Sequence, residues 1–187
     1  MRSRKISHNL YLAVCLASAI ALSSFSGKAE AQTQSSLTKK ECISATPGLS
    51  IEDILVKPFN VSFVVAKEVF PVTSLISSGT ERAEDTWNTL AILSGNQPVE
   101  LACNLRYSYK ELKLVFGVNT ANPYATKDNK ITFKVYLDGD SKGEKEVVVG
   151  RKREWKLNLE GVKNISFKVQ CKKDKCPALA FSEMSLK

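Results

Sequence analysis

The sequence predicts an all-β fold, an antiparallel β-sandwich of jelly-roll type with a short helix or irregular stretch in its N-terminal part. Three observations predict it: apolar and polar residues alternate along most of residues 110–186, the alternating segments are short and closely spaced, and turn residues separate them. Alternate side chains of a strand lie on opposite faces of the sheet, so each segment has one buried and one solvent-exposed face. Such sheets are usually antiparallel and pack against a second sheet.

The strands are expected mainly in the second half of the chain. They are predicted at 98–106, 110–118, 131–138, 145–149, 154–159, 163–170 and 178–186. Asp138-Gly139 is typical of a tight turn between two strands, and Gly143 lies in the same connection. In the last segment the apolar positions change from odd to even numbers, which predicts a β-bulge near residues 182–183.

The first half of the chain has a weaker pattern. Residues 32–48 are expected to be a flexible leader, because they begin with a stretch rich in Ser, Thr and Gln and contain the turn signal Pro47-Gly48. Ser50 is expected to cap a single helical turn that runs to Val56. Residues 49–187 are predicted to form a single β-sandwich domain.

Residues 1–31 have the features of a secretory signal peptide. Basic residues precede an apolar run from Leu10 to Phe25, and Ala29-Glu30-Ala31 supplies small residues before a cleavage site. A membrane anchor is the disfavoured alternative, because the run is shorter than the ~20 residues that a transmembrane helix needs. After cleavage near Ala31 we expect a secreted or periplasmic protein of the cell envelope, with no membrane span in the mature chain.

The composition excludes several kinds of chemistry. The single histidine, His8, lies in the signal segment, so the mature chain has no imidazole for nucleophile pairs, acid–base catalysis or zinc binding. No catalytic constellation is visible, and we expect that the protein is not an enzyme. A pair of carboxylates of the glycosidase type is the alternative that the sequence leaves open.

The chain is mildly basic. It carries a net charge of +8, and four basic residues and one acidic residue lie in 1–31, which leaves +5 for residues 32–187. This excess favours an anionic partner such as an acidic polysaccharide or a lipid head group, but solvated lysines explain it more simply. Lys172, Lys173 and Lys175 are accordingly expected to form a solvated basic tip. No nucleic-acid partner is expected, because no nucleic-acid-binding motif is present.

Cysteines at 42, 103, 171 and 176 remain after the signal segment. An even number of cysteines in an exported chain indicates disulfides, and three connectivities are open. We favour Cys171–Cys176, which closes a short loop, and Cys42–Cys103, which ties the N-terminal segment to a central strand. Four thiolates binding zinc are the rival arrangement, but the spacing lacks two close pairs and the compartment is oxidising, so no metal site is expected.

Four segments together resemble a known family. They are residues 109–119, 131–139, 155–167 and 180–186. In this order and spacing, residues 94–186 resemble the NPCBM-type carbohydrate-binding modules, a branch of the galactose-binding-like jelly rolls that was first noted beside glycoside hydrolases. The resemblance implies a galactose-binding-domain-like sandwich and non-catalytic sugar binding. The histidine that the family usually carries before its middle strands is missing from residues 91–97.

The connection between the strands at 110–118 and 131–138 contains the candidate sugar site. Sugar recognition needs an aromatic face for the apolar side of the ring, and amides or carboxylates for the hydroxyls. Tyr124 is expected to stack on the sugar, and Asn119, Asn122 and Asp128 to form hydrogen bonds. A polar connection rich in turns is the alternative, since Asn, Pro and Asp suit turns. Asp128 and backbone carbonyls are also weighed as a structural calcium site, and no other cofactor is expected.

Both tryptophans that follow the signal segment are weighed as further sugar platforms. Trp87 lies in an irregular stretch and is the second candidate for ligand binding, whereas Trp155 has the inward parity and is expected in the core. The predicted function is an exported, non-catalytic module that binds a carbohydrate or a cell-envelope glycan. The alternative is a structural or protein-interaction sandwich of the envelope without sugar binding, which would expose an apolar patch to a protein partner.

Overall fold

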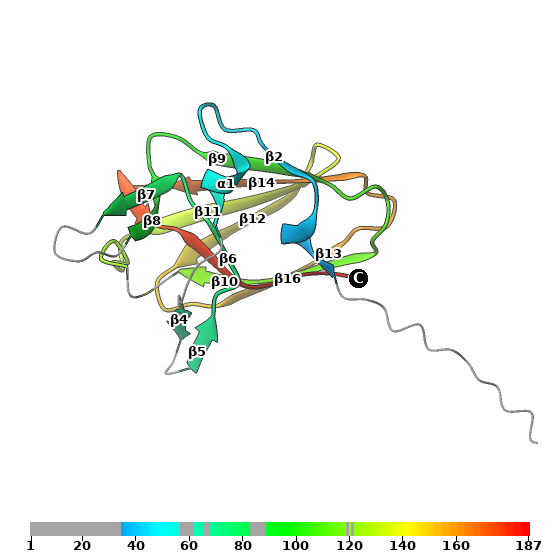
Figure 1. Cartoon of the computed structure of the whole chain (residues 1–187). Helices are drawn as coiled ribbons and strands as arrows, with labels where there is room; N and C mark the ends of the chain where they lie inside the picture. Colours follow the sequence, from blue (N-terminus) through cyan, green and yellow to red (C-terminus); the bar gives the residue numbers. More distant parts are fainter. Residues whose placement is uncertain (1–34, 57–61, 66–67, 83–88, 119, 121) are drawn as a thin grey trace, which may run out of the picture. The chain divides into compact units, whose positions relative to one another are not determined.

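The structure is a computed structural model of the chain, and it describes residues 35–56, 62–65, 68–82, 89–118, 120 and 122–187. Residues Gln32–Lys187 form one compact unit. Within the described residues, no helix is both long enough and apolar enough to cross a bilayer. Two large antiparallel sheets face each other in this unit (Figure 1).

The strands of both sheets are ordered in space differently from the sequence. The first sheet contains β13 (Arg153–Asn158), β10 (Glu111–Val118), β16 (Leu179–Leu186), β6 (Ser74–Ile76) and β3 (Leu55–Val56), with β1 (Ser35–Ser36) also paired to β16. The second contains β12 (Asp140–Val148), β11 (Lys130–Leu137), β14 (Asn164–Cys171), β9 (Val99–Asn104) and β2 (Cys42–Ser44). Smaller sheets are formed by β15 (Lys175–Pro177), β8 (Thr89–Ser94) and β7 (Gly79–Arg82), and by the hairpin of β4 (Ser62–Val65) and β5 (Glu68–Pro71).

Aromatic rings from both large sheets meet in the core between them. Phe116 of β10 and Phe133 of β11 have ring centroids 5.1 Å apart, and Phe133 and Phe181 of β16 are 5.7 Å apart. Phe167 of β14 lies 5.5 Å from Phe133. All four rings are buried, as the alternation of the sequence requires. The predicted antiparallel β-sandwich is therefore confirmed.

The hairpin between β11 and β12 differs from the prediction in length. Asp138 and Gly139 have φ angles of 50° and 92°, as a two-residue turn with both central residues in the left-handed region requires. β12 begins directly after this turn at Asp140, so it starts earlier than the expected residue 145. Gly143 lies inside the strand, at a register shift that leaves Lys142 as the extra residue. A bulge thus allows the strand to continue where a longer connection was expected.

The bulge expected in the last strand is confirmed. Val115 pairs with Glu183 and Phe116 pairs with Phe181, so Ser182 is the extra residue of β16. The bulge explains why both halves of the strand present apolar side chains to the core although their positions have opposite parity.

The prediction of a flexible leader up to residue 48 is wrong from Ser35 onward. β1 pairs with β16, a 3-10 helix spans Leu37–Lys39, and β2 is the edge strand beside β9. Leu37 is fully buried in the core. The polar composition predicted a flexible segment, but burial of Leu37 and strand pairing with both large sheets order the chain here.

Ser50 caps the short helix α1 (Ile51–Ile54) as expected. The Asp53 N–H donates to Ser50 Oγ at 3.2 Å, and the Ser50 N–H donates to the Asp53 carboxylate at 2.9 Å. This reciprocal pair is a capping box. The hydrogen bonds from the Ser50 backbone and hydroxyl hold the pKa of Asp53 below its usual value. The helix ends before the expected residue 56, because Leu55–Val56 pairs with β6 as β3.

Both favoured disulfides are present. Cys42–Cys103 joins β2 to β9, and Cys171–Cys176 closes the connection between β14 and β15. Cys103 and Cys171 face the core, as the parity of Cys103 predicts. The first bridge therefore fixes the N-terminal segment to the second sheet.

Candidate functional site

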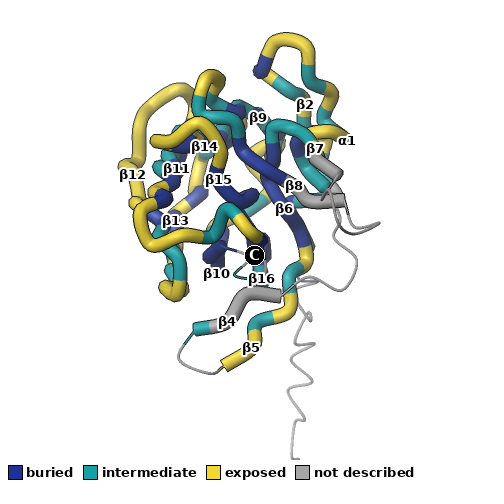
Figure 2. The backbone as a smooth tube through the Cα atoms, turned by 90° about the vertical axis from the view of Figure 1, so that its left-hand side faces the viewer, coloured by how far each residue is buried: buried dark blue, intermediate teal, exposed yellow. Residues whose placement is uncertain are grey.

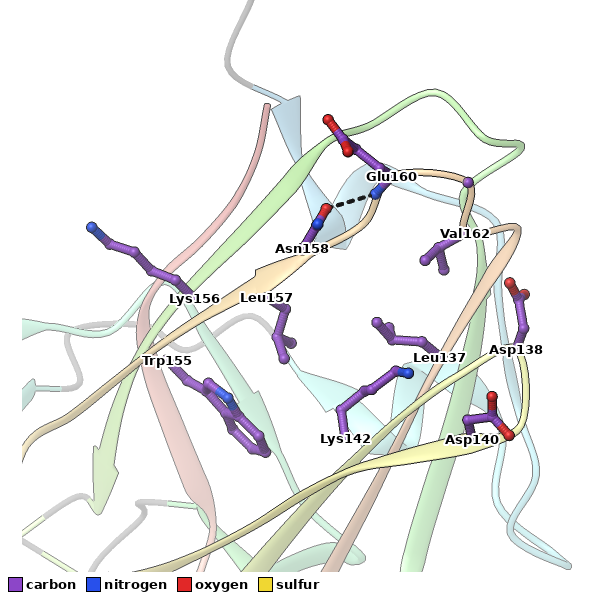
Figure 3. A pocket seen from close by; sticks show the side chains of 11 residues that line it. Leu137, Asp138, Asp140, Lys142, Trp155, Lys156, Leu157, Asn158, Glu160 and Val162 are labelled. Carbon is purple, nitrogen blue, oxygen red and sulfur yellow. Dashed lines mark hydrogen bonds between the residues drawn. The ribbon is translucent and has the colours of Figure 1, made fainter.

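An open groove lies where the two large sheets end side by side. β12 is the last strand of one sheet and β13 the last strand of the other, and these strands do not pair with each other. The groove between them has a volume of about 630 Å³ (Figure 3). Small-molecule sites usually have roughly 300–1,000 Å³. The lining residues are Leu137, Asp138, Asp140, Lys142, Trp155, Lys156, Leu157, Asn158, Glu160, Gly161 and Val162.

The inner face of β12 explains why the sandwich is open here. Lys145, Gly143 and Asp140 each pair with a buried apolar residue of β11, so these three positions lie on the core side of the strand. A core strand would carry apolar side chains there, whereas β12 has two charges and a glycine. All positions from 140 to 146 are exposed (Figure 2). The polar inner face keeps the edges of the two sheets from closing over the core.

Trp155 forms the aromatic wall of the groove. Its indole is half-buried, and its edge packs on Phe133 with a centroid distance of 6.0 Å. Lys145 Nζ lies 5.2 Å from the centroid of the indole. A Cβ atom at Gly143 would lie 3.8 Å from Cζ2 of the indole, so β12 passes directly beside the ring. Trp155 thus packs against the core as predicted, but it also lines a groove.

Hydrogen bonds fix the turn end of the groove. The Asp138 carboxylate accepts from the N–H groups of Asn164 at 2.8 Å and Lys163 at 3.2 Å. Asn158 Oδ1 accepts from the Glu160 N–H at 2.9 Å. These bonds join the turn between β11 and β12 to the connection between β13 and β14, so the lining is preorganised for a ligand.

Asp140 and Lys142 are the lining groups most available to a ligand. Neither side chain forms a hydrogen bond or an ion pair with another residue in the described part of the chain. Figure 3 shows Lys142 extending from β12 across the groove toward Leu137, whereas Lys156 and Glu160 point away from its centre. A groove with an indole at one end, an ammonium group across its middle and a carboxylate near its turn end suits a ligand whose rings carry hydroxyls (Figure 3).

The connection expected to bind sugar lies at the opposite end of the sandwich. It leads from the end of β10 to the start of β11, whereas the groove lies at the end of β11. Tyr124 is half-buried, with Lys175 Nζ 5.6 Å from its ring centroid, and Asp128 is exposed. Asn122 is only 4% exposed, and its Oδ1 accepts from the Tyr124 N–H at 2.9 Å.

Asn122 therefore stabilises a turn within the connection. This is what the alternative interpretation, a polar connection rich in turns, predicts. Asn129 adds to it by donating to the carbonyl oxygens of Tyr124 and Lys175. Sugar binding by Tyr124, Asn122 and Asp128 stays a prediction, and none of the three lines the groove. Asn119 and Trp87, the other two expected ligand residues, lie outside the described residues.

The expected calcium site at Asp128 also stays a prediction. In the part of the chain that the structure describes, no three carboxylate, thiolate or imidazole side chains gather as metal ligands would. Asp128 would therefore have to bind the ion with backbone carbonyl groups and water.

The alternation of the sequence does not single out Asp140 and Lys142, because it predicts that residues 139–144 connect two strands. The signal that would have found them is the Asp138-Gly139 pair itself. Such a pair fixes a two-residue turn, so the next strand begins at Asp140. Asp140 then falls on the inner face opposite Leu137.

The sequence matches no family model and no curated protein. Its structure is similar to that of the CBM51 module from Clostridium perfringens GH95, solved in complex with methyl-galactose. The match has a TM-score of 0.58 and 15% identity, and it covers 83% of this chain and 100% of the other. The chain has the fold of a carbohydrate-binding module. At this identity, the likeness establishes the fold and leaves the ligand to be tested.

A second similar structure contains the CBM51-2 and INT domains of Clostridium perfringens ZmpB. It has a TM-score of 0.49 and 14% identity, and the match covers 71% of this chain and 27% of that chain. The present chain therefore spans about a quarter of that structure.

Proposed function

We propose that this protein is an exported, non-catalytic module that binds a carbohydrate in the groove between β12 and β13. The observation that carries the proposal is that Trp155, Lys142 and Asp140 line one groove, in a chain with the fold of a carbohydrate-binding module. The apolar face of a sugar ring packs on the indole, and its hydroxyl groups bond to the carboxylate and the ammonium group.

A galactose-type sugar of the cell envelope is the proposed ligand. The similar CBM51 structure was solved with methyl-galactose, which makes this sugar the first probe. The signal-like segment 1–31 and the two disulfides support export to an oxidising compartment, where envelope glycans are the available carbohydrates. The four segments that resemble the NPCBM-type modules also support binding of a sugar without catalysis.

Replacing Asp140 with alanine, or Lys142 with alanine, is expected to weaken sugar binding about tenfold, since each removes a hydrogen bond to a charged group. Trp155→Ala is expected to weaken it about thirtyfold or more, as loss of a central aromatic anchor does. Binding is measured by calorimetry with methyl-galactose and then on a glycan array. With the residues that the structure describes, the side chains of Asp140 and Lys142 form no hydrogen bond or ion pair, so both variants should keep the wild-type melting temperature.

Tyr124→Ala is the matched comparison, because Tyr124 belongs to the other candidate site. If the groove binds the sugar, this variant retains wild-type affinity. If Tyr124→Ala abolishes binding while Asp140→Ala and Lys142→Ala leave it unchanged, the sugar site lies in the connection between β10 and β11. Absence of binding to every glycan by the folded protein would overturn both sites.

An envelope protein-interaction role is the second candidate, and one surface favours it. Ile43 of β2 is 67% exposed and Tyr107, in the turn after β9, is 63% exposed. Tyr107 has a positive φ of 59°, and the neighbouring Arg106 binds the Glu41 carboxylate at 2.6 Å. An exposed apolar side chain on an edge strand and another on a fixed turn suit a protein partner. Co-purification of a partner that is lost in Ile43→Ser/Tyr107→Ser, with no glycan affinity, would replace the sugar proposal.

A further inference from the structure

Positive charge is concentrated at the end of the sandwich opposite the groove. Three connections lie there, which we take together with the strand residues that flank them: residues 122–130, 146–152 and 172–175. Their basic residues are Lys127, Lys130, Arg151, Lys152, Lys172, Lys173 and Lys175, and their acidic residues are Asp128, Glu146 and Asp174. Residues 32–187 carry a net +5, so the excess of four at this end accounts for most of it. We call these three connections the basic end.

Backbone contacts hold the basic end in place. The Lys172 N–H donates to the Lys130 carbonyl at 3.1 Å, which joins two of the connections. The Gly95 N–H donates to the Asp174 carbonyl at 2.9 Å, and a Cβ atom at Gly95 would lie only 1.8 Å from the Lys173 carbonyl oxygen. Only glycine at position 95 therefore lets residues 172–175, which we call the lysine loop, pass this close to the backbone of Gly95. With the Cys171–Cys176 disulfide, these contacts order the loop before any ligand arrives.

Several cations of the basic end have no carboxylate to neutralise them. Lys130 and Lys172 share one carboxylate, that of Glu146, at 3.3 and 3.2 Å. The hydrogen bonds from Lys172 and Lys130 hold the pKa of Glu146 below its usual value, so this group stays ionised between its two cations. Lys127, Arg151 and Lys173 are exposed and form no ion pair with any residue that the structure describes.

We propose that the basic end is a second binding surface, which takes an acidic polysaccharide carrying carboxylate or sulfate groups. Cations spread over three connections match a polymer whose negative charges recur along its length, and each contact needs only an exposed ammonium or guanidinium group. The surface is separate from the groove, so one sandwich holds a neutral sugar at one end and an acidic chain at the other.

The observations favour a polymer in solution over an anionic membrane. Proteins that dock on lipid head groups usually combine basic residues with apolar side chains that enter the interface. Among the described residues, the large apolar side chains that are well exposed are Ile43, Val69 and Tyr107. None of them belongs to the basic end, although Val69 precedes Phe70, whose ring centroid lies 4.3 Å from Lys152 Nζ. A surface with seven basic and three acidic residues suits a hydrated polyanion.

The test compares two double variants of equal charge change. Lys127→Glu/Lys173→Glu alters the basic end, and Lys110→Glu/Lys163→Glu alters exposed lysines at the groove end. The purified protein is titrated with polygalacturonate, heparin and neutral galactan at 50 and 300 mM NaCl. We expect wild-type protein to bind both acidic polymers at low salt, with affinity falling about tenfold or more at the higher salt. The basic-end variant should lose about tenfold in affinity and the groove-end variant less than about twofold.

Each other outcome overturns the proposal. Equal losses in the two variants would mean that net charge alone attracts the polymer. Stronger binding to phosphatidylglycerol vesicles or to duplex DNA than to both polysaccharides would replace the polysaccharide with another anion. Trp155→Ala is expected to leave polygalacturonate binding unchanged, which separates this surface from the sugar groove; no binding to either acidic polymer would overturn the basic end alone.

Discussion

Phe133→Ala is expected to lower the free energy of unfolding by about 3–5 kcal/mol, because it removes a fully buried ring and leaves a cavity. Four rings surround Phe133, with centroids 5.1 to 6.0 Å away. They come from four different strands of the two large sheets, so no single strand can move in to fill the space. Chemical denaturation followed by tryptophan fluorescence measures the change.

Tyr136→Ala is the matched control for this variant. Tyr136 lies on the same strand as Phe133 but has the opposite parity and is half-exposed, so its loss is expected to cost about 1 kcal/mol or less. Similar losses in the two variants would contradict the assignment of the inner and outer faces of β11. Phe133→Leu, which fills more of the space, should fall between the two.

Removing the Cys42–Cys103 disulfide, as Cys42→Ala/Cys103→Ala, is expected to lower the free energy of unfolding by about 4 kcal/mol in the chain-entropy account. The two cysteines are 61 residues apart, so the bridge greatly restricts the unfolded chain. It also fixes β2 to β9 and closes the N-terminal segment onto the second sheet. The loss is measured by denaturation under non-reducing conditions.

The second disulfide provides the comparison. Cys171 and Cys176 are only 5 residues apart, so Cys171→Ala/Cys176→Ala is expected to cost about 2 kcal/mol. Loss of this bridge should also let residues 172–175 of the basic end adopt other conformations, and so weaken polygalacturonate binding. Equal stability losses in the two double variants would show that loop length does not determine the contribution of these bridges.

The strands of the core were predictable because one parity is buried in each of them. Leu112, Phe133 and Phe167 follow the alternation and are all buried. The N-terminal segment was not predictable in this way, since β1 and β2 have only two and three residues and too few positions to show a period. Its place in the sheets depends on long-range pairing with β16 and β9, which the local composition does not reveal.

The groove was not predicted from the sequence. The sequence identified Trp155 as an inward-facing residue, but the alternation alone gives no sign that β13 is the last strand of its sheet. Strand order in space determines which inward positions are sealed and which are open. Asp140 and Lys142 line the groove because β12 is the last strand of the other sheet, and this position depends on strand order in space.

The charged inner face of β12 has a consequence for solubility. An unpaired edge strand offers free N–H and C=O groups to any other extended chain, and sheets that grow in this way aggregate. Lys145 lies on the inner side of this edge, over the indole of Trp155. A strand added from another molecule would bury that ammonium group without a counter-ion, at a large cost in hydration energy. Lys145 therefore disfavours the addition of a strand from another molecule at the β12 edge of the sandwich.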